Sequence, residues 1–236
     1  MNWTAYDVAL FDLDGVITPT AELHMRAWAE MFTAFLESRG ITEPYTDEDY
    51  FSYVDGKPRY DGVRSFLESR GIDLPEGDPT DEPAAETVCG LGNRKNEVFN
   101  AVLARDGIAP YPGTLTLMDH LDGIEMPMAI VSSSKNARTV LTAAGLLDRF
   151  PVIMDGVVAA REGIPGKPAP DTFVAAAAAL GATPGSAVVI EDAVSGVAAG
   201  RAGGFGLTIG VDRGAGADVL REAGADVVVE DLEVLA

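Results

Sequence analysis

The hydrophobic pattern of the chain changes character along its length. A short apolar run near the start, Val8 to Phe11, is typical of a buried strand. From there to about residue 105, apolar positions recur at helical spacing, as at Leu23, Ala27 and Met31. From residue 111 onward, short apolar runs alternate with helical segments. The pattern therefore predicts a helical block inside a strand-helix alternation.

The predicted elements form two groups. The first group is helical, with helices at 21–39, 60–69 and 93–105 and loops at 41–58 and 73–92, and Thr20 is the expected N-cap of its first helix. The second group has strands at 126–131, 152–154, 187–190, 206–211 and 226–229, separated by helices at 114–121, 136–144, 171–180, 194–202 and 216–223. Alternation of this kind predicts a parallel sheet with right-handed crossovers.

The opening strand matches the later strand-helix units and not the helical block that comes after it. We therefore predict an α/β protein with a Rossmann-like, three-layer parallel-sheet core and an inserted α-helical cap domain. The core domain comprises residues 1–17 and 108–236, and the cap domain comprises residues 18–107. A chain of 236 residues is long enough to bury a sizeable core in this arrangement.

Composition narrows the classes of partner. The formal net charge is −20, which disfavours nucleic acid and anionic membranes as partners. No apolar run approaches the length of a membrane span, and the first residues lack the basic start and apolar core of a signal peptide. The single cysteine, Cys89, excludes an internal disulfide and a cysteine-rich zinc site. We expect a cytoplasmic monomer that acts on a small molecule.

The opening strand ends in two acids, Asp12 and Asp14. Two carboxylates this close at the end of a buried strand repel each other, and a bound cation is the simplest compensation. Gly15 then allows the backbone to turn sharply. An isolated pair with this spacing is also typical of a solvated turn, so the interpretation depends on the residues at the ends of the other strands.

Polar side chains stand after the other predicted strands. Ser132 to Ser134 come after the strand 126–131, and Glu191-Asp192 come after the strand 187–190. Lys167 lies between Gly166 and Pro168, ahead of a helix. Each group alone is also typical of a capping loop, a helix N-terminal charge pair or a surface loop. Because ligands of open parallel sheets bind beyond the carboxyl ends of the strands, their shared position favours one site.

The residue types at this edge limit the chemistry. Carboxylates suit a hard cation such as Mg²⁺, and serine hydroxyls and lysine suit phosphate oxygens. The chain has only four lysines, Lys57, Lys95, Lys135 and Lys167, and each stands in a loop-like or helix-start context. A metal beside a carboxylate nucleophile is the set of parts for phosphoryl transfer through an aspartyl-phosphate.

Four motifs in order, FDLDGV, SSSKN, GKPAPD and IED, resemble those of the haloacid dehalogenase superfamily of phosphotransferases. The longer stretches FDLDGVIT…AELHMRAW, VSSSKN and GKPAPDTF more closely resemble its β-phosphoglucomutase branch, which carries an α-helical cap after the first strand. The resemblance covers nearly the whole chain.

The resemblance implies a role for each motif residue. Asp12 would be the nucleophile and Asp14 the general acid and base. Mg²⁺ would be held by the Asp12 carboxylate, the Asp14 backbone carbonyl and Asp192, with Glu191 beside them. The implied phosphate-binding residues are Ser132, Ser133 and Lys167, and the implied substrate-binding residues are His24, Trp28, Gly56, Arg59, Lys95, Asn96, Ser134, Lys135 and Asn136.

The function implied by the resemblance is a Mg²⁺-dependent conversion of β-glucose 1-phosphate to glucose 6-phosphate. The alternative is a sugar-phosphate phosphatase of the same superfamily, in which water resolves the aspartyl-phosphate. A third alternative, a non-catalytic phospho-acceptor module, is shorter and lacks the helical insertion. One departure from the branch is Pro19, where an aspartate is usual. Since proline fixes φ and removes an N–H at the expected hinge, cap closure is expected to differ.

Overall fold

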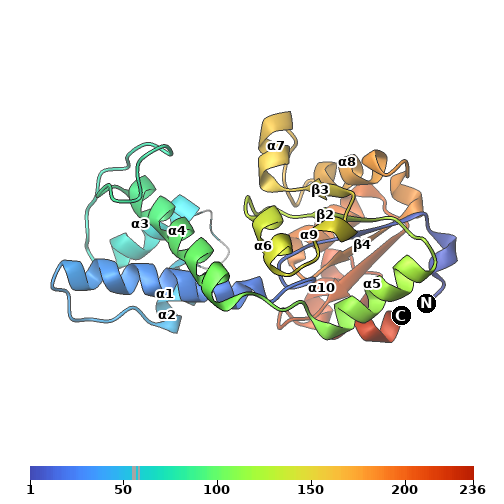
Figure 1. Cartoon of the computed structure of the whole chain (residues 1–236), viewed down its shortest axis with the longest axis horizontal. Coiled ribbons are helices and arrows are strands. Elements are labelled where there is room, and N and C mark those ends of the chain that lie inside the picture. Colours follow the sequence, from blue (N-terminus) through green and yellow to red (C-terminus); the bar gives the residue numbers. More distant parts are fainter. Residues whose placement is uncertain (55–56, 58) are drawn as a thin grey trace. The chain divides into compact units, whose positions relative to one another are not determined.

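The computed structural model describes residues 1–54, 57 and 59–236, and these divide into two compact units. The larger unit comprises Met1–Thr20 and Ile108–Ala236, and the smaller comprises Ala21–Gly107 (Figure 1). Each unit buries a hydrophobic cluster of its own. The chain thus leaves the larger unit once and returns to it once.

The larger unit is built on a six-stranded, all-parallel sheet, which confirms the predicted fold class. The strands are β1 (Val8–Phe11), β2 (Met128–Val131), β3 (Val152–Met154), β4 (Ala187–Glu191), β5 (Leu207–Val211) and β6 (Val227–Val229). Their order across the sheet is β3-β2-β1-β4-β5-β6. β1 is central, since Leu10 is paired with Ala129 of β2 on one side and Val189 of β4 on the other. The carboxyl end of β1 therefore lies between the ends of β2 and β4.

Helices cover both faces of this sheet (Figure 1). Leu10 packs with Phe173 on one face, and the ring of Phe11 contacts that of Phe150 on the other, with centroids 6.3 Å apart. The helical segments of the larger unit are η1 (Trp3–Ala5), α5 (Pro112–Gly123), α6 (Ala137–Ala143), η3 (Leu147–Arg149), α7 (Gly156–Glu162), α8 (Asp171–Ala179), η4 (Pro184–Ser186), α9 (Val194–Gly203), α10 (Ala217–Ala223) and η5 (Leu232–Leu235). The unit therefore has three layers.

Helix α7 was not predicted from the sequence. It lies beyond β3 (Figure 1), and only Val158 among its seven residues packs, partly buried, against the core cluster, so the helix shows no clear apolar periodicity. Its start is set by Asp155, whose carboxylate accepts the backbone N–H groups of Val157 and Val158. Its end is set by Gly163, which adopts a left-handed conformation. Only these capping residues signal the helix in the sequence.

The smaller unit is helical in the residues that the structure describes. Its elements are α1 (Thr20–Ser38), α2 (Asp47–Asp49), η2 (Tyr50–Val54), α3 (Arg59–Ser69) and α4 (Val88–Asp106). Phe32, Phe35 and Phe66 lie at its core with no exposed surface. The three long helices correspond to the helices predicted from apolar spacing. No helix in the described part of the chain is long and apolar enough to span a membrane.

Two predicted boundaries in this unit are wrong. α4 begins at Val88 and not at residue 93, so the predicted loop 73–92 ends five residues early and contains helical Gly90 and Gly92. Thr87 caps the helix by accepting the N–H of Gly90 at 2.9 Å. The region 41–58, predicted as a loop, contains α2, which starts at a capping box formed by Thr46 and Asp49.

The start of α1 also differs from the prediction. Thr20 is the first helical residue of α1, and was expected to be its N-cap. Pro19 lies directly before it. The N–H groups at the start of a helix have no partner within the helix, so the N–H that proline lacks costs no helical hydrogen bond. The Thr20 hydroxyl instead reaches back into the loop after β1, where it bonds to Asp14.

Candidate active site

The loop after β1 presents two acids in different settings. Asp12 is 7% exposed, and its N–H donates to the carbonyl of Ile190 at 2.9 Å. Asp14 is half-buried, and its carboxylate accepts a hydrogen bond from the hydroxyl of Thr20. Gly15 separates the loop from the next turn with φ of +82°, a conformation that favours glycine. Thr20 was not identified as a site residue from the sequence, because nothing there places it beside Asp14.

Lys167 ties three strand ends together. Its Nζ donates to Asp12 Oδ1 at 2.5 Å, to the carbonyl of Val131 at 2.8 Å and to Glu191 Oε1. Its side chain is only 6% exposed, and its ammonium lies 4.8 Å from the ring centroid of Phe173. Lys167 therefore joins the carboxyl ends of β1, β2 and β4 through one buried positive charge.

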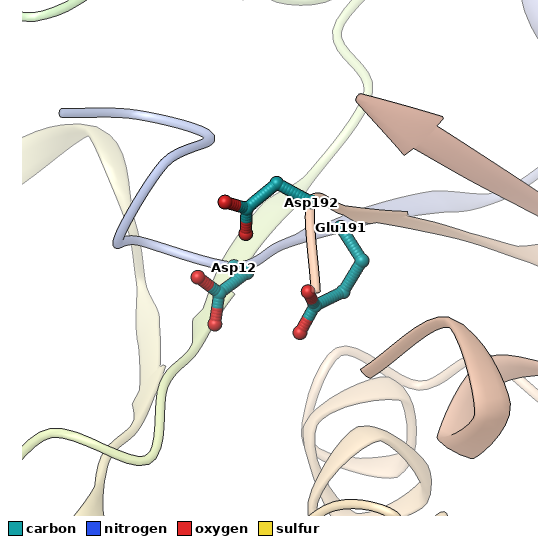
Figure 2. A group of neighbouring side chains, drawn as sticks. All are labelled: Asp12, Glu191 and Asp192. Carbon is teal, nitrogen blue, oxygen red and sulfur yellow. The ribbon is translucent and has the colours of Figure 1, made fainter. Parts of the chain in front are cut away.

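Three acids gather around this lysine. Figure 2 shows Asp12 at the end of β1 and Glu191 and Asp192 at the end of β4. Each of the three offers a carboxylate oxygen, and these oxygens lie within 4.8 Å of one another. Both oxygens of Glu191 have partners, because Oε1 accepts from Lys167 and Oε2 accepts from the N–H of Ala193. Asp12 and Asp192 are therefore the better candidates for direct ligands of a cation.

The electrostatics of the cluster show an excess of negative charge. Burial raises the pKa of Asp12 well above its ordinary value, against the opposing charge of Lys167. Burial and the neighbouring Glu191 raise the pKa of Asp192 to about 7. Burial alone would lower the pKa of Lys167, but the charges of Asp12 and Glu191 raise it above its ordinary value. One lysine does not balance three carboxylates, so the donor set fits a hard divalent cation with oxygen ligands.

The serine-rich loop lies at the end of β2, next to the carbonyl that Lys167 bonds. Ser132 is 3% exposed, and its Oγ accepts the N–H of Ser134 at 3.0 Å. Ser134 Oγ in turn accepts the N–H of Asn136, the residue before α6, at 3.1 Å. Ser133 and Lys135 are exposed. The hydroxyls thus hold the loop in shape as well as being candidate phosphate ligands.

A second cationic cluster lies within the smaller unit. Lys95, 5% exposed on α4, donates from Nζ to His24 Nδ1 of α1 at 2.6 Å. The same ammonium lies 5.1 Å from the ring centroids of both Trp28 and Phe99. His24 stacks on Phe99 with centroids 4.5 Å apart. The lysine charge therefore lies against two aromatic rings and an imidazole.

His24 is held neutral in this setting. Burial and then the charges of Lys95 and Arg59 lower its pKa to about 3. Because a lysine ammonium has donors and no acceptor, Nδ1 of His24 must accept, and the proton of the neutral ring then lies on Nε2. Arg59, at the start of α3, donates to Asn96 Oδ1 at 2.9 Å. The cluster therefore combines two cations with an imidazole N–H donor.

The structure thus groups the predicted site residues into two sets. Asp12, Asp14, Ser132, Lys167, Glu191 and Asp192 meet at the carboxyl ends of β1, β2 and β4 in the larger unit. His24, Trp28, Arg59, Lys95 and Asn96 meet between α1, α3 and α4 in the smaller unit. Gly56 lies outside the described residues.

Comparisons with known proteins give consistent likenesses. The model of a family described as haloacid dehalogenase-like hydrolase matches residues 6–204. The β-phosphoglucomutase of Mycobacterium bovis is 51% identical over 96% of this chain and 90% of that protein. The validoxylamine A 7'-phosphate phosphatase of Streptomyces hygroscopicus subsp. limoneus is 31% identical over 96% of this chain and 94% of that protein.

Among solved structures, CbbY from Rhodobacter sphaeroides in complex with phosphate has a TM-score of 0.72 with this chain. The two are 26% identical in sequence, and the match covers 98% of this chain and 96% of that chain. The structural likeness therefore includes both units of the chain.

Proposed function

Because the chain belongs to the haloacid dehalogenase-like hydrolase family, and is therefore an enzyme, we propose that it is a Mg²⁺-dependent phosphomutase converting β-glucose 1-phosphate into glucose 6-phosphate. The observation that carries this proposal is the presence of two buried lysines in different settings. Lys167 lies among the acids around Asp12, and Lys95 lies beside His24 and aromatic rings. A mutase handles a sugar that carries two phosphates during turnover, so two separate cationic sites suit it.

The proposed chemistry has two half-reactions on Asp12. In the first, a carboxylate oxygen of Asp12 attacks phosphorus, the bond from phosphorus to the sugar oxygen breaks, and Asp14 gives its proton to that oxygen. In the second, another sugar hydroxyl attacks the aspartyl-phosphate and gives its proton to Asp14, while the bond to Asp12 breaks. Protons and phosphoryl groups therefore balance over one cycle.

Asp12 and Asp14 suit these unequal roles. Lys167 donates a hydrogen bond to one carboxylate oxygen of Asp12, and this bond fixes the orientation of the carboxylate at the end of the strand. Asp14 is half-buried and accepts from a neutral hydroxyl, so its carboxyl group is the better candidate to exchange a proton. Lys167, Ser132 and Ser133 are proposed to bind the oxygens of the transferring phosphoryl group.

The proposed metal site uses residues that fit a divalent cation. The Asp12 carboxylate, the Asp14 backbone carbonyl and Asp192 would hold Mg²⁺, with Glu191 beside them to fix Lys167. When bound, Mg²⁺ supplies positive charge to the phosphoryl oxygens and offsets the repulsion among the carboxylates. The raised pKa of Asp192 supports this proposal, since it reflects a buried carboxyl group whose negative charge a cation would stabilise.

The cationic cluster of the smaller unit is proposed to bind the phosphate group of the substrate that is not being transferred. Lys95 and Arg59 would contact its second phosphate, and His24 would donate from Nε2. Trp28 offers an apolar face, and Asn96 orients Arg59. Gly56, Ser134, Lys135 and Asn136 complete the proposed set of substrate-binding residues.

A phosphatase acting on a sugar phosphate is the second candidate. A relative named as a phosphatase matches nearly the whole chain, and the same Asp12 chemistry serves if water attacks in the second half-reaction. The two functions differ in whether water is excluded while the aspartyl-phosphate persists. The buried cation cluster around Lys95 favours the mutase, because a phosphatase that releases one phosphate does not need to bind a second phosphate group.

One assay separates the two functions. The protein is incubated with Mg²⁺ and β-glucose 1-phosphate, with and without a trace of the 1,6-bisphosphate, and glucose 6-phosphate and inorganic phosphate are followed together. The mutase proposal predicts glucose 6-phosphate as the main product and stimulation by the bisphosphate. Inorganic phosphate as the main product would instead establish the phosphatase. Asp12→Asn is the control, and its activity should be lost in either case.

A further inference from the structure

Arg213 is held rigidly in the loop after β5. The carboxylate of the preceding residue, Asp212, accepts the N–H groups of Gly214 and Gly216 at 2.9 and 3.0 Å. The N–H of Asp212 donates to the carbonyl of Val229 in β6 at 2.8 Å. The backbone of Arg213 is therefore fixed from both sides, and its side chain starts from a defined position.

The guanidinium of Arg213 binds backbone and an aromatic ring. Nε donates to the carbonyl of Gly15 at 2.9 Å, and Nη1 donates to the carbonyl of Glu230 at 3.0 Å. Its central carbon lies 3.8 Å from the ring centroid of Tyr111. No carboxylate of the described residues forms an ion pair with it, although the chain contains 37 acidic residues. An arginine used in this way suits precise placement of backbone more than charge balance.

The carbonyl that Arg213 holds belongs to the loop of Asp14. Four successive carbonyls of this loop accept hydrogen bonds, and Arg213 serves the first of them. Thr114 Oγ1 donates to the carbonyl of Val16 at 2.7 Å. The N–H of Tyr111 donates to the carbonyl of Ile17 at 2.9 Å, and the N–H of Gly15 donates to that of Thr18 at 2.8 Å. Arg213 also stacks on the ring of Tyr111, the residue whose backbone N–H donates to the Ile17 carbonyl.

Gly15, the residue next to Asp14, is closely packed. A Cβ atom on Gly15 would lie 1.9 Å from Oδ2 of Asp192, so the backbone at this point runs directly against the acid cluster. A shift of the Gly15 carbonyl would therefore move the Asp14 carboxyl group relative to the neighbouring acids. A displacement of about 1 Å at a reacting group is enough to cost roughly 10²-fold in rate.

We propose that Arg213 is a positioning residue for Asp14, which it holds through the Gly15 carbonyl so that Asp14 can protonate the leaving sugar oxygen. This inference rests on the proposed function. It predicts a selective defect, because proton donation matters for a leaving group that departs as an alkoxide and matters little for one that departs as a stable anion. The nucleophile Asp12 is held by other contacts and should be unaffected.

The test compares two phosphoryl donors in the presence of Mg²⁺. β-Glucose 1,6-bisphosphate has a sugar oxygen as leaving group, and acetyl phosphate releases acetate, which needs no proton. The single-turnover rate of Asp12 phosphorylation is measured with each donor for the wild type, Arg213→Met and Arg213→Lys. We expect both variants to lose roughly 10- to 100-fold with the bisphosphate and less than about threefold with acetyl phosphate.

Controls separate this defect from a general loss of structure. Arg221→Met removes an exposed arginine of α10 that pairs with Asp218, and both of its rates should equal those of the wild type. Tyr111→Leu removes the ring under Arg213 and should reproduce the selective loss. It also keeps the proposal testable if substitution of Arg213 prevents folding, which thermal unfolding would show.

The possible outcomes are distinct. Equal losses with both donors, or no loss with either, would overturn the role of Arg213 while leaving the proposed function intact. If neither donor phosphorylated Asp12 in the wild type, the proposed function would be refuted, and the role of Arg213 with it.

Discussion

At the scale of single residues, the most informative side chain is Lys167. The sequence indicated a candidate phosphate ligand, since a lysine between glycine and proline stands after one strand and precedes a helix. The sequence did not indicate that its ammonium also binds Asp12, 155 residues away, and Glu191, 24 residues away. Contacts of that range depend on strand order, which local patterns do not specify.

We predict that Lys167→Met impairs both stability and activity. The substitution leaves three clustered carboxylates without their cation, and breaking a buried ion pair costs about 3–5 kcal/mol in the free energy of unfolding. Phosphoryl transfer should fall by roughly 10²- to 10³-fold, because the variant loses the hydrogen bond that orients Asp12 and the positive charge proposed to bind the phosphoryl oxygens. Denaturant unfolding and steady-state kinetics measure the two effects.

Lys57→Met is the matched control for stability. Lys57 is exposed and donates to Ser65, so its loss should change the free energy of unfolding by less than about 1 kcal/mol. If Lys167→Met were as stable as Lys57→Met, the buried cluster would not depend on the lysine charge as described.

His24 is expected to make the stability of the fold depend on pH. Because its pKa is about 3 when folded and 6.5 ordinarily, the unfolded chain takes up a proton over that range and the folded chain does not. Stability is therefore lost as pH falls below 6.5, by up to about 1.4 kcal/mol per pH unit from this group. The ring proton resonances of His24 should remain those of a neutral imidazole down to about pH 4.

The chain favours this measurement, because it contains only two histidines and the other, His120, is exposed. Lys95→Met removes one of the charges that disfavour the imidazolium, so it should raise the pKa of His24 above its wild-type value. A midpoint for His24 near 6.5 in the wild type would contradict the buried, neutral assignment.

Among the secondary-structure elements, α4 differs from its predicted start because of two glycines. Gly90 and Gly92 indicated a loop, and both lie in the first turns of α4. The structural reason is close packing. A Cβ on Gly92 would lie 2.6 Å from the ring of Tyr60. The absence of a side chain at Gly92 therefore allows the start of α3 to pack closely against α4. Glycine also breaks helices, and a single sequence does not separate the two uses.

We predict that Gly92→Ala weakens substrate binding. The added methyl group pushes Tyr60 away and lies 3.3 Å from Cδ of Arg59, so the arginine moves from its position beside Asn96. KM for β-glucose 1-phosphate should rise by roughly tenfold, with a smaller change in kcat, because the reacting groups lie in the other unit. Steady-state kinetics measure the two constants separately.

Gly123→Ala is the matched control, since it adds the same methyl group to another helix with no heavy atom within 4 Å. Its kinetic constants should be those of the wild type. A kcat defect in Gly92→Ala with unchanged KM would contradict the assignment of this cluster to substrate binding.

At the scale of the whole molecule, alternation of strands and helices was sufficient to predict the parallel sheet. Short apolar runs such as 187–190 and 206–211 have one interpretation in that context, and the structure has β4 and β5 there. The strand order, which places β1 between β2 and β4, is not a property of any one segment. It is this order that brings the acids after β1 and β4 together.

The large net negative charge is expected to make thermal stability depend on salt. With 37 acidic and 17 basic residues, the folded chain repels itself, and salt screens that repulsion. The thermal midpoint should rise when NaCl is raised from ~0.02 M to ~0.5 M, an ionic strength at which exposed charges are screened. Thermal unfolding followed by circular dichroism measures this. A midpoint that falls with salt would mean that the exposed ion pairs outweigh the repulsion.

Direct identification of the modified residue tests whether Asp12 carries the phosphoryl group. The protein is incubated with Mg²⁺ and acetyl phosphate, treated with borohydride to convert an aspartyl-phosphate to homoserine, and digested for peptide mass spectrometry. We expect homoserine at position 12 in the wild type and no modification in Asp12→Asn. Modification at another residue, or an unmodified Asp12 in protein that still transfers phosphoryl groups, would show that Asp12 is not the nucleophile.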